Sequence, residues 1–147
     1  MAPSFQIAAL SPGWLQASVV SATHRAGGIG VLDFEYVSNC NVALECIHRY
    51  NNAKLPFGVK VDADSTELLD ILSANPPAHL NTVFLTSQRP ELLRDQIQKL
   101  RRHNIFTLVE TTSLDHANRA VEVGPDAIVA KGHEAGGRIG EETTFIL

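Results

Sequence analysis

The chain has 147 residues, of which 44% are hydrophobic, and this is enough for a single domain over residues 1–147 with a buried core. Its formal net charge of −4, without a Lys/Arg-rich stripe on any expected helix, argues against nucleic acid as a partner. No apolar run approaches the roughly 20 residues of a membrane span, and residues 1–6 lack the features of a secretion signal, so we expect a cytoplasmic protein.

Cysteines and histidines do not form a metal site in this sequence. Cys40 and Cys46 are the two cysteines, and neither has a second cysteine or a histidine at the spacing of metal ligands. We expect both to be small buried hydrophobic residues in a reducing compartment. We expect local hydrogen bonds or solvation, rather than a function, for five scattered histidines: His24, His48, His79, His103 and His116.

A short apolar run, followed by a turn and then by an amphipathic stretch, recurs about six times along the chain. Each run is nearly continuous, which is typical of parallel strands that are buried on both faces. The expected strands are Phe5 to Leu10, Ile29 to Phe34, Phe57 to Val61, Thr82 to Leu85, Phe106 to Val109 and Ala127 to Ala130.

Segments between the runs have the period and the end signals of helices. Ser65 and Ser113 stand at N-cap positions, and Pro90 stands in a first turn, where proline is tolerated. The expected helices are Trp14 to Arg25, Asn41 to Asn51, Ser65 to Ser73, Pro90 to His103 and Leu114 to Val123. Residues that accept a left-handed backbone follow three of them: Gly27 with Gly28, Asn104 and Gly124.

Strand and helix units that repeat every 20 to 30 residues restrict the architecture to an α/β fold with parallel strands. A (β/α) barrel and an open doubly wound sheet both fit, because both bury parallel strands under right-handed crossovers. A complete barrel needs eight units in about 250 residues, so a barrel would be incomplete here. A third possibility, a receiver-like open sheet, lacks the clustered acidic residues that hold Mg²⁺ after its first strand.

The end of the sequence has the features of an interrupted helix. Glu141 and Glu142 favour the N-terminal end of a helix dipole, and Thr143 to Leu147 resembles an apolar first turn. We therefore expect a sixth helix that is cut short, in a chain truncated before its barrel closes.

The segment richest in chemistry is Lys131 to Gly140, which reads Lys-Gly-His-Glu-Ala-Gly-Gly-Arg-Ile-Gly directly after an expected strand. Loops at the carboxyl ends of parallel strands are where α/β folds bind their ligands. Its glycines let a backbone approach a ligand closely, while charged side chains supply protons and charge. The spacing matches neither the dinucleotide fingerprint nor the P-loop, and a turn that only reverses the chain is the structural alternative.

This segment resembles the Gly-x-Glu-Ala-Gly-Gly-His signature of nitronate monooxygenases and FMN-dependent enoyl-acyl carrier protein reductases. The resemblance extends to Arg25 to Gly30, which is similar to that family's Asn-Ala-Gly-Gly-Leu-Gly turn, and to Phe57 to Val61, similar to its Phe-Gly-Val-Asn strand. It covers about the first six of eight units of a TIM-type (β/α) barrel. The form embedded in polyketide or polyunsaturated fatty acid synthases, in which arginine follows the paired glycines, is the most similar.

What the resemblance implies is an FMN site over the carboxyl ends of the strands. The cofactor-binding residues that it implies are Ala8, Ala9, Leu10, Lys60, Lys131, Glu134, Ala135, Gly136 and Gly137. Lys60 replaces the family's flavin-facing asparagine and adds a positive charge near the ring.

Two residues are the catalytic candidates, Arg138 and His133. The family's catalytic histidine falls at Arg138, and a guanidinium with a pKa above about 12 cannot act as a general base near neutral pH. Arg138 could instead hold an anionic substrate or a reduced flavin by charge-assisted hydrogen bonds. His133, within the same loop, is the imidazole that we expect to replace the lost base.

The implied function is that of an FMN-dependent oxidoreductase domain that acts on a small-molecule or acyl-carrier-bound substrate, with NAD(P)H as a possible electron donor. The alternative is a non-catalytic structural or docking module of a multienzyme synthase. We expect weak or absent FMN binding by the 147-residue chain, because such barrels anchor the phosphate after strands seven and eight. We also expect a homo-oligomer, or association with the remainder of a larger chain, because an open sheet leaves two edges.

Other polar residues have simpler explanations. Asp62 could line the site, whereas Asp64 with Ser65 and Glu67 is explained by helix capping. Trp14 is either a lid over the site or a staple onto the first helix. The basic residues Arg94, Lys99, Arg101 and Arg102 are expected to form a solvated helix face that Glu91 and Asp95 balance.

Overall fold

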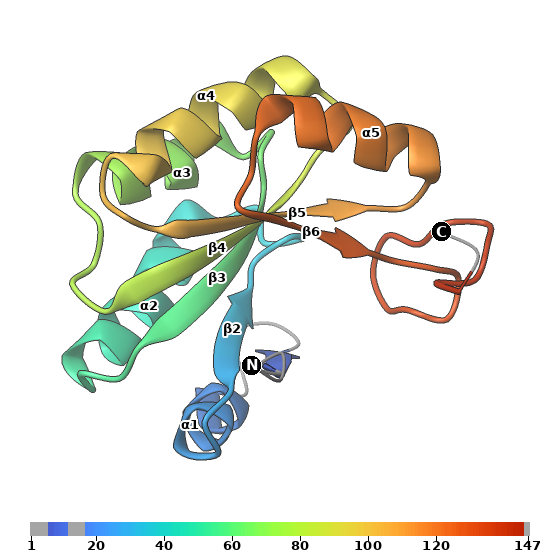
Figure 1. Cartoon of the computed structure of the whole chain (residues 1–147). Helices are drawn as coiled ribbons and strands as arrows, with labels where there is room; N and C mark the ends of the chain where they lie inside the picture. Colours follow the sequence, from blue (N-terminus) through green and yellow to red (C-terminus); the bar gives the residue numbers. More distant parts are fainter. Residues whose placement is uncertain (1–5, 12–16, 146–147) are drawn as a thin grey trace, which may run out of the picture.

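A computed structural model describes residues 6–11 and 17–145 of the chain. Strands and helices alternate along the described residues from the first element to the last (Figure 1). The elements are β1 (Ala8–Ser11), α1 (Ala17–Arg25), β2 (Ile29–Asp33), α2 (Cys40–Asn52), β3 (Phe57–Asp62), α3 (Thr66–Ala74), β4 (Leu80–Thr86), α4 (Pro90–Arg101), β5 (Phe106–Thr111), α5 (Leu114–Val123) and β6 (Ala127–Ala130). Trp14 lies outside the described residues.

The six strands form one sheet in the order β1-β2-β3-β4-β5-β6, and every neighbouring pair is parallel. The sheet curls, and the helices follow its outer side from α1 at one end to α5 at the other (Figure 1). Strand order that follows sequence order throughout is typical of a (β/α) barrel, whereas a doubly wound sheet reverses its order. The fold is therefore an incomplete barrel, and the predicted fold class is confirmed.

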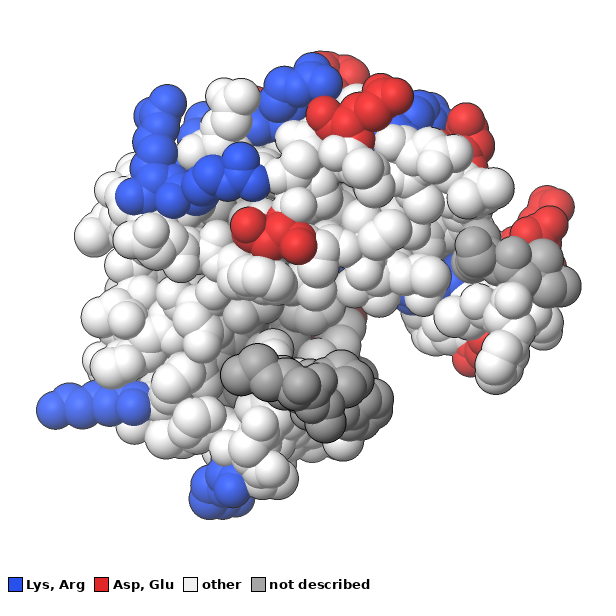
Figure 2. Space-filling model, viewed as in Figure 1, with Lys and Arg blue, Asp and Glu red and all other residues white. Residues whose placement is uncertain are grey.

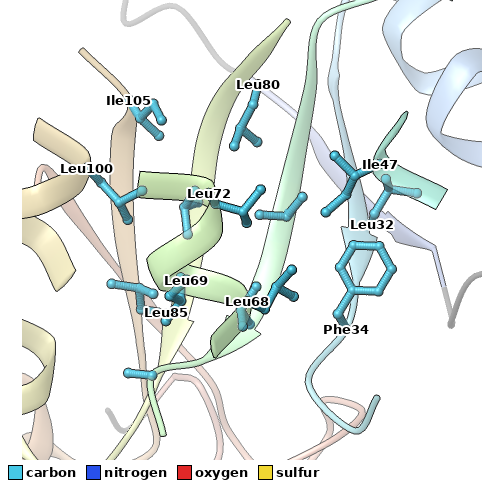
Figure 3. Packing of buried hydrophobic residues seen from close by; sticks show 14 of the residues in the cluster. Leu32, Phe34, Ile47, Leu68, Leu69, Leu72, Leu80, Leu85, Leu100 and Ile105 are labelled. Carbon is cyan, nitrogen blue, oxygen red and sulfur yellow. The ribbon is translucent and has the colours of Figure 1, made fainter. Parts of the chain in front are cut away.

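The hydrophobic core lies between the sheet and its outer helices. Leu68, Leu69 and Leu72 of α3 are buried against the strands, because spacings of one, three and four residues place them on one face of the helix (Figure 3). All six residues of β3 are buried, as expected of a central strand covered on both faces. Strand β6 alternates between intermediate and exposed residues, because it is an edge of the sheet.

Backbone conformations at the helix ends follow the predicted signals. Gly124 ends α5 with a left-handed φ of 82°, and Asn104 after α4 has a φ of 57°. Ser113 caps α5, because its side chain accepts a hydrogen bond from the amide of His116. At Gly30 the sheet needs glycine for space, since an added Cβ would lie 2.7 Å from the Cα of Val20.

Two local predictions are wrong. No helix follows β6 in the described residues, which end at residue 145. The segment instead folds back on the Gly-rich loop, where the amide of Thr144 donates to Glu134 and its hydroxyl accepts from the amide of Gly132. Asp64 is not a capping residue, because its carboxylate binds Arg89 at 2.7 Å, and the side chain of Ser65 at the N-cap of α3 makes no capping hydrogen bond.

Basic and acidic side chains intermingle on the surface around α4 and α5 (Figure 2). Lys99 contacts both Asp95 and Asp70 at 2.8 Å, and Arg101 lies 3.9 Å from Asp126. The prediction that Asp95 balances this basic helix face is confirmed for Lys99, whereas Asp70 and Asp126 lie outside the predicted set. Within residues 6–11 and 17–145, none of the helices has the length and apolar character of a membrane span.

Candidate active site

Charged side chains gather where the strands end. The carboxyl ends of parallel strands meet at one edge of the sheet, so residues at or just after these ends become neighbours although they lie far apart in the sequence. The charged residues in this position are Asp33 and Glu35 (β2), Lys60 and Asp62 (β3), Glu110 (β5) and Lys131 (β6). We call this set, together with Arg138 from the Gly-rich loop, the rim cluster.

Lys60 is the centre of the rim cluster. Its ammonium lies 2.8 Å from Glu35, 2.9 Å from Glu110 and 3.8 Å from Asp33, and its side chain is only 2% exposed. Burial alone would lower the pKa of Lys60, but hydrogen bonds to Glu35 and Glu110 outweigh burial and raise this pKa above its ordinary value. Lys60 is therefore a permanent cation at neutral pH.

Lys131 and Gly137 join the Gly-rich loop to this cluster. The ammonium of Lys131 lies 3.1 Å from Glu110, so that one buried carboxylate holds two lysines. Gly137 has a left-handed φ of 77°, and a Cβ at this position would lie 3.3 Å from a carboxylate oxygen of Glu35 and 3.4 Å from the ammonium of Lys131. The loop backbone therefore passes directly over the buried charges, where a side chain has little room.

Arg138 completes the cluster from the same loop. One terminal nitrogen of its guanidinium lies 2.6 Å from Asp62, and its Nε lies 3.5 Å from Glu35. Its side chain remains 46% exposed, so part of the guanidinium faces solvent. The rim cluster thus contains four carboxylates and three cations. Burial raises the pKa of Asp33, although the hydrogen bond from the amide of Glu35 and the charge of Lys60 act in the opposite direction.

A cavity of about 250 Å³ opens beside the rim cluster, at the ends of β4 and β5. It is lined by Thr86, Ser87, Gln88, Glu110, Thr112, His116, Arg138 and Ile139. The walls combine a buried imidazole, hydroxyl groups, an apolar side chain and the guanidinium of the Gly-rich loop.

His116 is held firmly in this wall. Its Nε2 lies 2.9 Å from the backbone carbonyl of Ser87, and its Nδ1 lies 3.3 Å from the side-chain nitrogen of Gln88. Burial lowers the pKa of His116, although the hydrogen bond to Ser87 acts in the opposite direction. The imidazole is therefore neutral near pH 7.

Several residues that the sequence predicted for the site lie elsewhere. His133 is 55% exposed and its Nδ1 lies 3.8 Å from Glu134 rather than near the rim cluster. Glu134 turns toward Thr144, whose hydroxyl and amide hydrogen bonds lower the pKa of Glu134 to about 2. Ala135 and Gly136 are on the same loop, with no atom within 4 Å of a Cβ added at Gly136.

The predicted first flavin-facing strand is separated from Lys60 by one strand. Leu10 pairs with Val31 of β2, and Val31 pairs with Gly58 of β3. Ala8, Ala9 and Leu10 thus lie in the edge strand β1. Only the carboxyl end of this strand, at Ser11, lies at the end of the sheet where the rim cluster is found.

Sequence reasoning missed four residues of the site: Asp33, Glu35, Glu110 and His116. For the carboxylates the signal was present, because an acidic residue within or directly after a buried apolar run falls at the carboxyl end of a strand. For His116 no local signal exists, since its place depends on how α5 packs against the end of β4. Among the residues that the structure describes, no group of three or more His, Cys, Asp or Glu side chains is arranged to hold a metal ion.

Comparisons with known proteins place this geometry in context. The chain is similar to the (3aS,4S,5R,7aS)-5-hydroxy-7a-methyl-1-oxo-octahydro-1H-indene-4-carboxyl-CoA dehydrogenases of Rhodococcus jostii, at 25% identity over 139 residues, and of Mycobacterium tuberculosis, at 26% over 137 residues. Each match covers 92% of this chain and 38% of the relative, so the chain spans well under half the length of these relatives.

Solved structures show the same fold. FabK from Thermotoga maritima superposes with a TM-score of 0.76 at 23% identity, over 97% of this chain and 45% of that one. Nitroalkane oxidase from Streptomyces ansochromogenes superposes with a TM-score of 0.73 at 24% identity, over 90% of this chain and 47% of that one. Both structures therefore contain a barrel portion like the one described here.

The family comparison concerns the part of the chain that includes the Gly-rich loop. Residues 81–146 match the family model of nitronate monooxygenase. This span contains β5, β6, Lys131 and Arg138, and it thus includes the cavity wall formed by α5. The predicted resemblance of this chain to the nitronate monooxygenase family is thereby confirmed.

Proposed function

We propose that this chain provides the flavin-facing half of an FMN-dependent oxidoreductase barrel, of the nitronate monooxygenase or enoyl reductase kind. The observation that carries the proposal is the Gly-rich loop, which lies in the family match and holds Gly137 directly over Glu35 and Lys131. Arg138 of the same loop pairs with Asp62. Because the chain spans less than half of its relatives, the proposed active unit includes further strands that close the sheet. A polyketide or fatty acid synthase-type protein is the proposed setting.

The residues of the rim cluster fit the ring end of a flavin. Lys131 uses one of its three ammonium donors on Glu110, and the described residues provide no further ion-pair partner for it. An ammonium with spare donors, beside a glycine that leaves its backbone uncovered, suits the oxygen and nitrogen acceptors of a flat ring. When bound, FMN would supply hydride transfer to or from the substrate.

The fit does not extend to the phosphate of FMN. Barrels of this kind bind phosphate through the loops after strands seven and eight, and the described residues form six strands. The acidic excess of the rim cluster also opposes an additional anion nearby. We therefore propose weak FMN binding by the 147-residue chain and firm binding by the closed barrel.

Arg138 is the proposed binding residue for the substrate. Its exposed guanidinium can donate to an anionic nitro or acyl oxygen while Asp62 keeps it in place. Permanent charge prevents Arg138 from taking a proton, so its role is to hold the anion and not to act as a base. The substrate is a small molecule or a group bound to an acyl carrier, and NAD(P)H is the proposed electron donor.

Reduction of the flavin provides the test of this function. The gene product that contains the chain is purified, loaded with FMN and mixed with NAD(P)H under anaerobic conditions, and the flavin absorbance is followed. Bleaching is expected in the wild type, whereas Arg138→Leu should still bleach but bind a nitronate or enoyl substrate at least about tenfold more weakly. Lys99→Met, which removes an exposed ammonium far from the Gly-rich loop, is the matched control and should behave as wild type.

A non-catalytic structural or docking module of a multienzyme synthase is the second candidate. It is favoured by the charge pairing in the rim cluster, because Lys60 is fully committed to carboxylates within the fold. A module of this kind would bind no FMN in the closed protein and would show no bleaching with NAD(P)H. The same absorbance experiment therefore separates the two candidates.

The open sheet suggests association with another chain segment. Strands β1 and β6 are the two edges of the sheet, and Ile128 in β6 is 40% exposed. We propose a homo-oligomer or association with the remainder of a larger protein, and sedimentation that shows only monomer would contradict this. Cys40 and Cys46 are unpaired, in keeping with the proposed cytoplasmic, reducing setting.

A further inference from the structure

The cavity at the ends of β4 and β5 has the size of a small-molecule site. Its volume of about 250 Å³ lies below the roughly 300 to 1,000 Å³ of sites that enclose drug-sized ligands. It is therefore too small for a whole cofactor and suits a compact molecule of a few heavy atoms. Ile139 supplies an apolar wall, and Arg138 supplies hydrogen-bond donors with a positive charge.

The hydrogen bonds of His116 define which of its nitrogens carries the proton. The carbonyl oxygen of Ser87 can only accept, so Nε2 must be the donor in the 2.9 Å contact. In a neutral ring Nδ1 is then the acceptor, and the amide of Gln88 donates to it across 3.3 Å. The unprotonated Nδ1 of His116 thus faces the side chain of Gln88, which is exposed in the cavity wall and which a bound molecule could replace as the partner of Nδ1.

Charged groups around His116 are arranged so that a negative charge can develop in the cavity. On its own helix, Asp115 and Arg119 pair with each other at 2.9 Å. From β5, Glu110 faces the cavity but is neutralised by two lysines, and from the Gly-rich loop Arg138 brings a guanidinium to the same cavity. Burial keeps His116 unprotonated, which is the state required of a base.

We propose that Nδ1 of His116 takes the proton from a small carbon acid bound in this cavity, and that Arg138 holds the resulting anion. The inference rests on the proposed function, because a nitroalkane is the carbon acid that this function suggests. In the step, the bond from the α-carbon to hydrogen breaks and its electron pair moves into the nitro group, which becomes a nitronate. The proton forms a new bond to Nδ1, and the reverse step returns a solvent proton to the carbon.

Exchange of the α-protons of nitroethane for deuterium tests this inference without any flavin. The 147-residue chain in D₂O is mixed with nitroethane, and loss of the α-proton signal is followed by proton NMR. The wild type should accelerate exchange above the buffer rate, and His116→Gln should lose at least about tenfold of that acceleration. Glutamine retains a donor for the Ser87 carbonyl, and circular dichroism checks that the variant is folded.

Two matched histidine variants control the experiment. His103→Gln changes an exposed imidazole in the turn after α4 and should leave the exchange rate unchanged. His133→Gln changes the other candidate base, whose side chain is 55% exposed, and should also leave it unchanged. Loss of exchange in His133→Gln, with exchange retained in a folded His116→Gln, would overturn the inference.

The pH profile of the wild type gives a second reading that does not depend on the variants. The exchange rate should rise with pH and follow a pKa below the ordinary value of 6.5, because burial favours neutral His116. Nitrogen NMR of the ring should show Nδ1 titrating over the same pH range. No exchange above buffer, or a profile unrelated to the His116 titration, would refute the inference. Nitroethane exchange by this chain, together with a closed parent barrel that never binds FMN, would retain the inference and instead disprove the proposed oxidoreductase.

Discussion

Replacing Lys60 by methionine is the most direct test of how the rim cluster is held together. Methionine keeps the length and apolar character of the lysine stem, so the change removes little more than the ammonium. Without it, Glu35 and Asp33 lose their nearest cation, and Glu110 retains only Lys131. Since the side chain of Glu35 is 0% exposed, water cannot replace the lost partner.

The expected loss of stability in Lys60→Met follows from the burial of its carboxylate partners. Breaking a buried ion pair by removing one partner costs about 3 to 5 kcal/mol, because the remaining charge is left without compensation. Urea unfolding followed by circular dichroism measures this loss. With a slope of about 2 kcal/mol per molar urea, the midpoint of Lys60→Met should fall by roughly 1.5 to 2.5 M.

The sign of the pH dependence provides a further check. Because the pKa of Lys60 is raised in the folded state, its contribution is complete below the ordinary value of 10.5 and is lost only as the pH rises through the folded value. The loss of stability of Lys60→Met relative to the wild type should instead shrink at acidic pH, where the unpaired carboxylates accept protons. Lys99→Met, which breaks the ion pairs with Asp70 and Asp95 at a side chain that is 34% exposed, should cost less than about 1 kcal/mol. Equal losses in the two variants would refute the reasoning.

Three further predictions concern packing, titration and a buried hydrogen bond. Gly30→Ala should lower the free energy of unfolding by about 1 to 3 kcal/mol in thermal denaturation, because its Cβ would meet the backbone of Val20. As the pH falls below 6.5, the free energy of unfolding should decline, because burial disfavours protonation of His116 in the folded state. Urea titrations at pH 5 and 7 should show a smaller decline of this free energy in His116→Gln than in the wild type. Asp126→Ala should cost about 1 to 3 kcal/mol in the same urea assay at pH 7, because the amide and hydroxyl of Thr107 lose an acceptor at 2.7 and 2.8 Å. Near pH 2 the difference in stability between this variant and the wild type should narrow, because the carboxylate of Asp126 takes up a proton.

Much of the fold could be predicted because its signals are local. The run Ala127 to Ala130 coincides with β6, and the glycine after Val123 gives the end of α5. Strand β4 begins two residues before the expected run, because Leu80 is followed by the exposed Asn81, which hides its place in the strand. The sixth helix was wrongly predicted, since hydrogen bonds between distant parts of the Gly-rich loop and Thr144 override the helix signals of the two glutamates.

The site was less predictable because it depends on how the units are arranged. Lys60, Lys131 and Arg138 could be named from the resemblance, yet their carboxylate partners come from other strands of the sheet. Lys60 of β3 pairs with Glu110 of β5, two positions away, and Arg138, which follows β6, pairs with Asp62 of β3, three positions away. The place of His116 depends on which face of α5 meets the segment after β4, where its Nε2 bonds the carbonyl of Ser87, and no property of the residue itself reveals this. His133 shows the converse, because membership of a Gly-rich motif did not bring its side chain to the rim cluster.

Agreement between the order of strands in space and in sequence has a consequence for how the chain is made. Each new strand pairs with the one synthesised just before it, and the helix between them packs beside the same two strands. Loop closure is therefore short at every step, and a polypeptide emerging from the ribosome can add units one after another without waiting for its distant end. Two polypeptides divided at the turn between α3 and β4 should accordingly find each other and restore the rim cluster, because the cut severs a single connection and leaves each strand-helix unit whole.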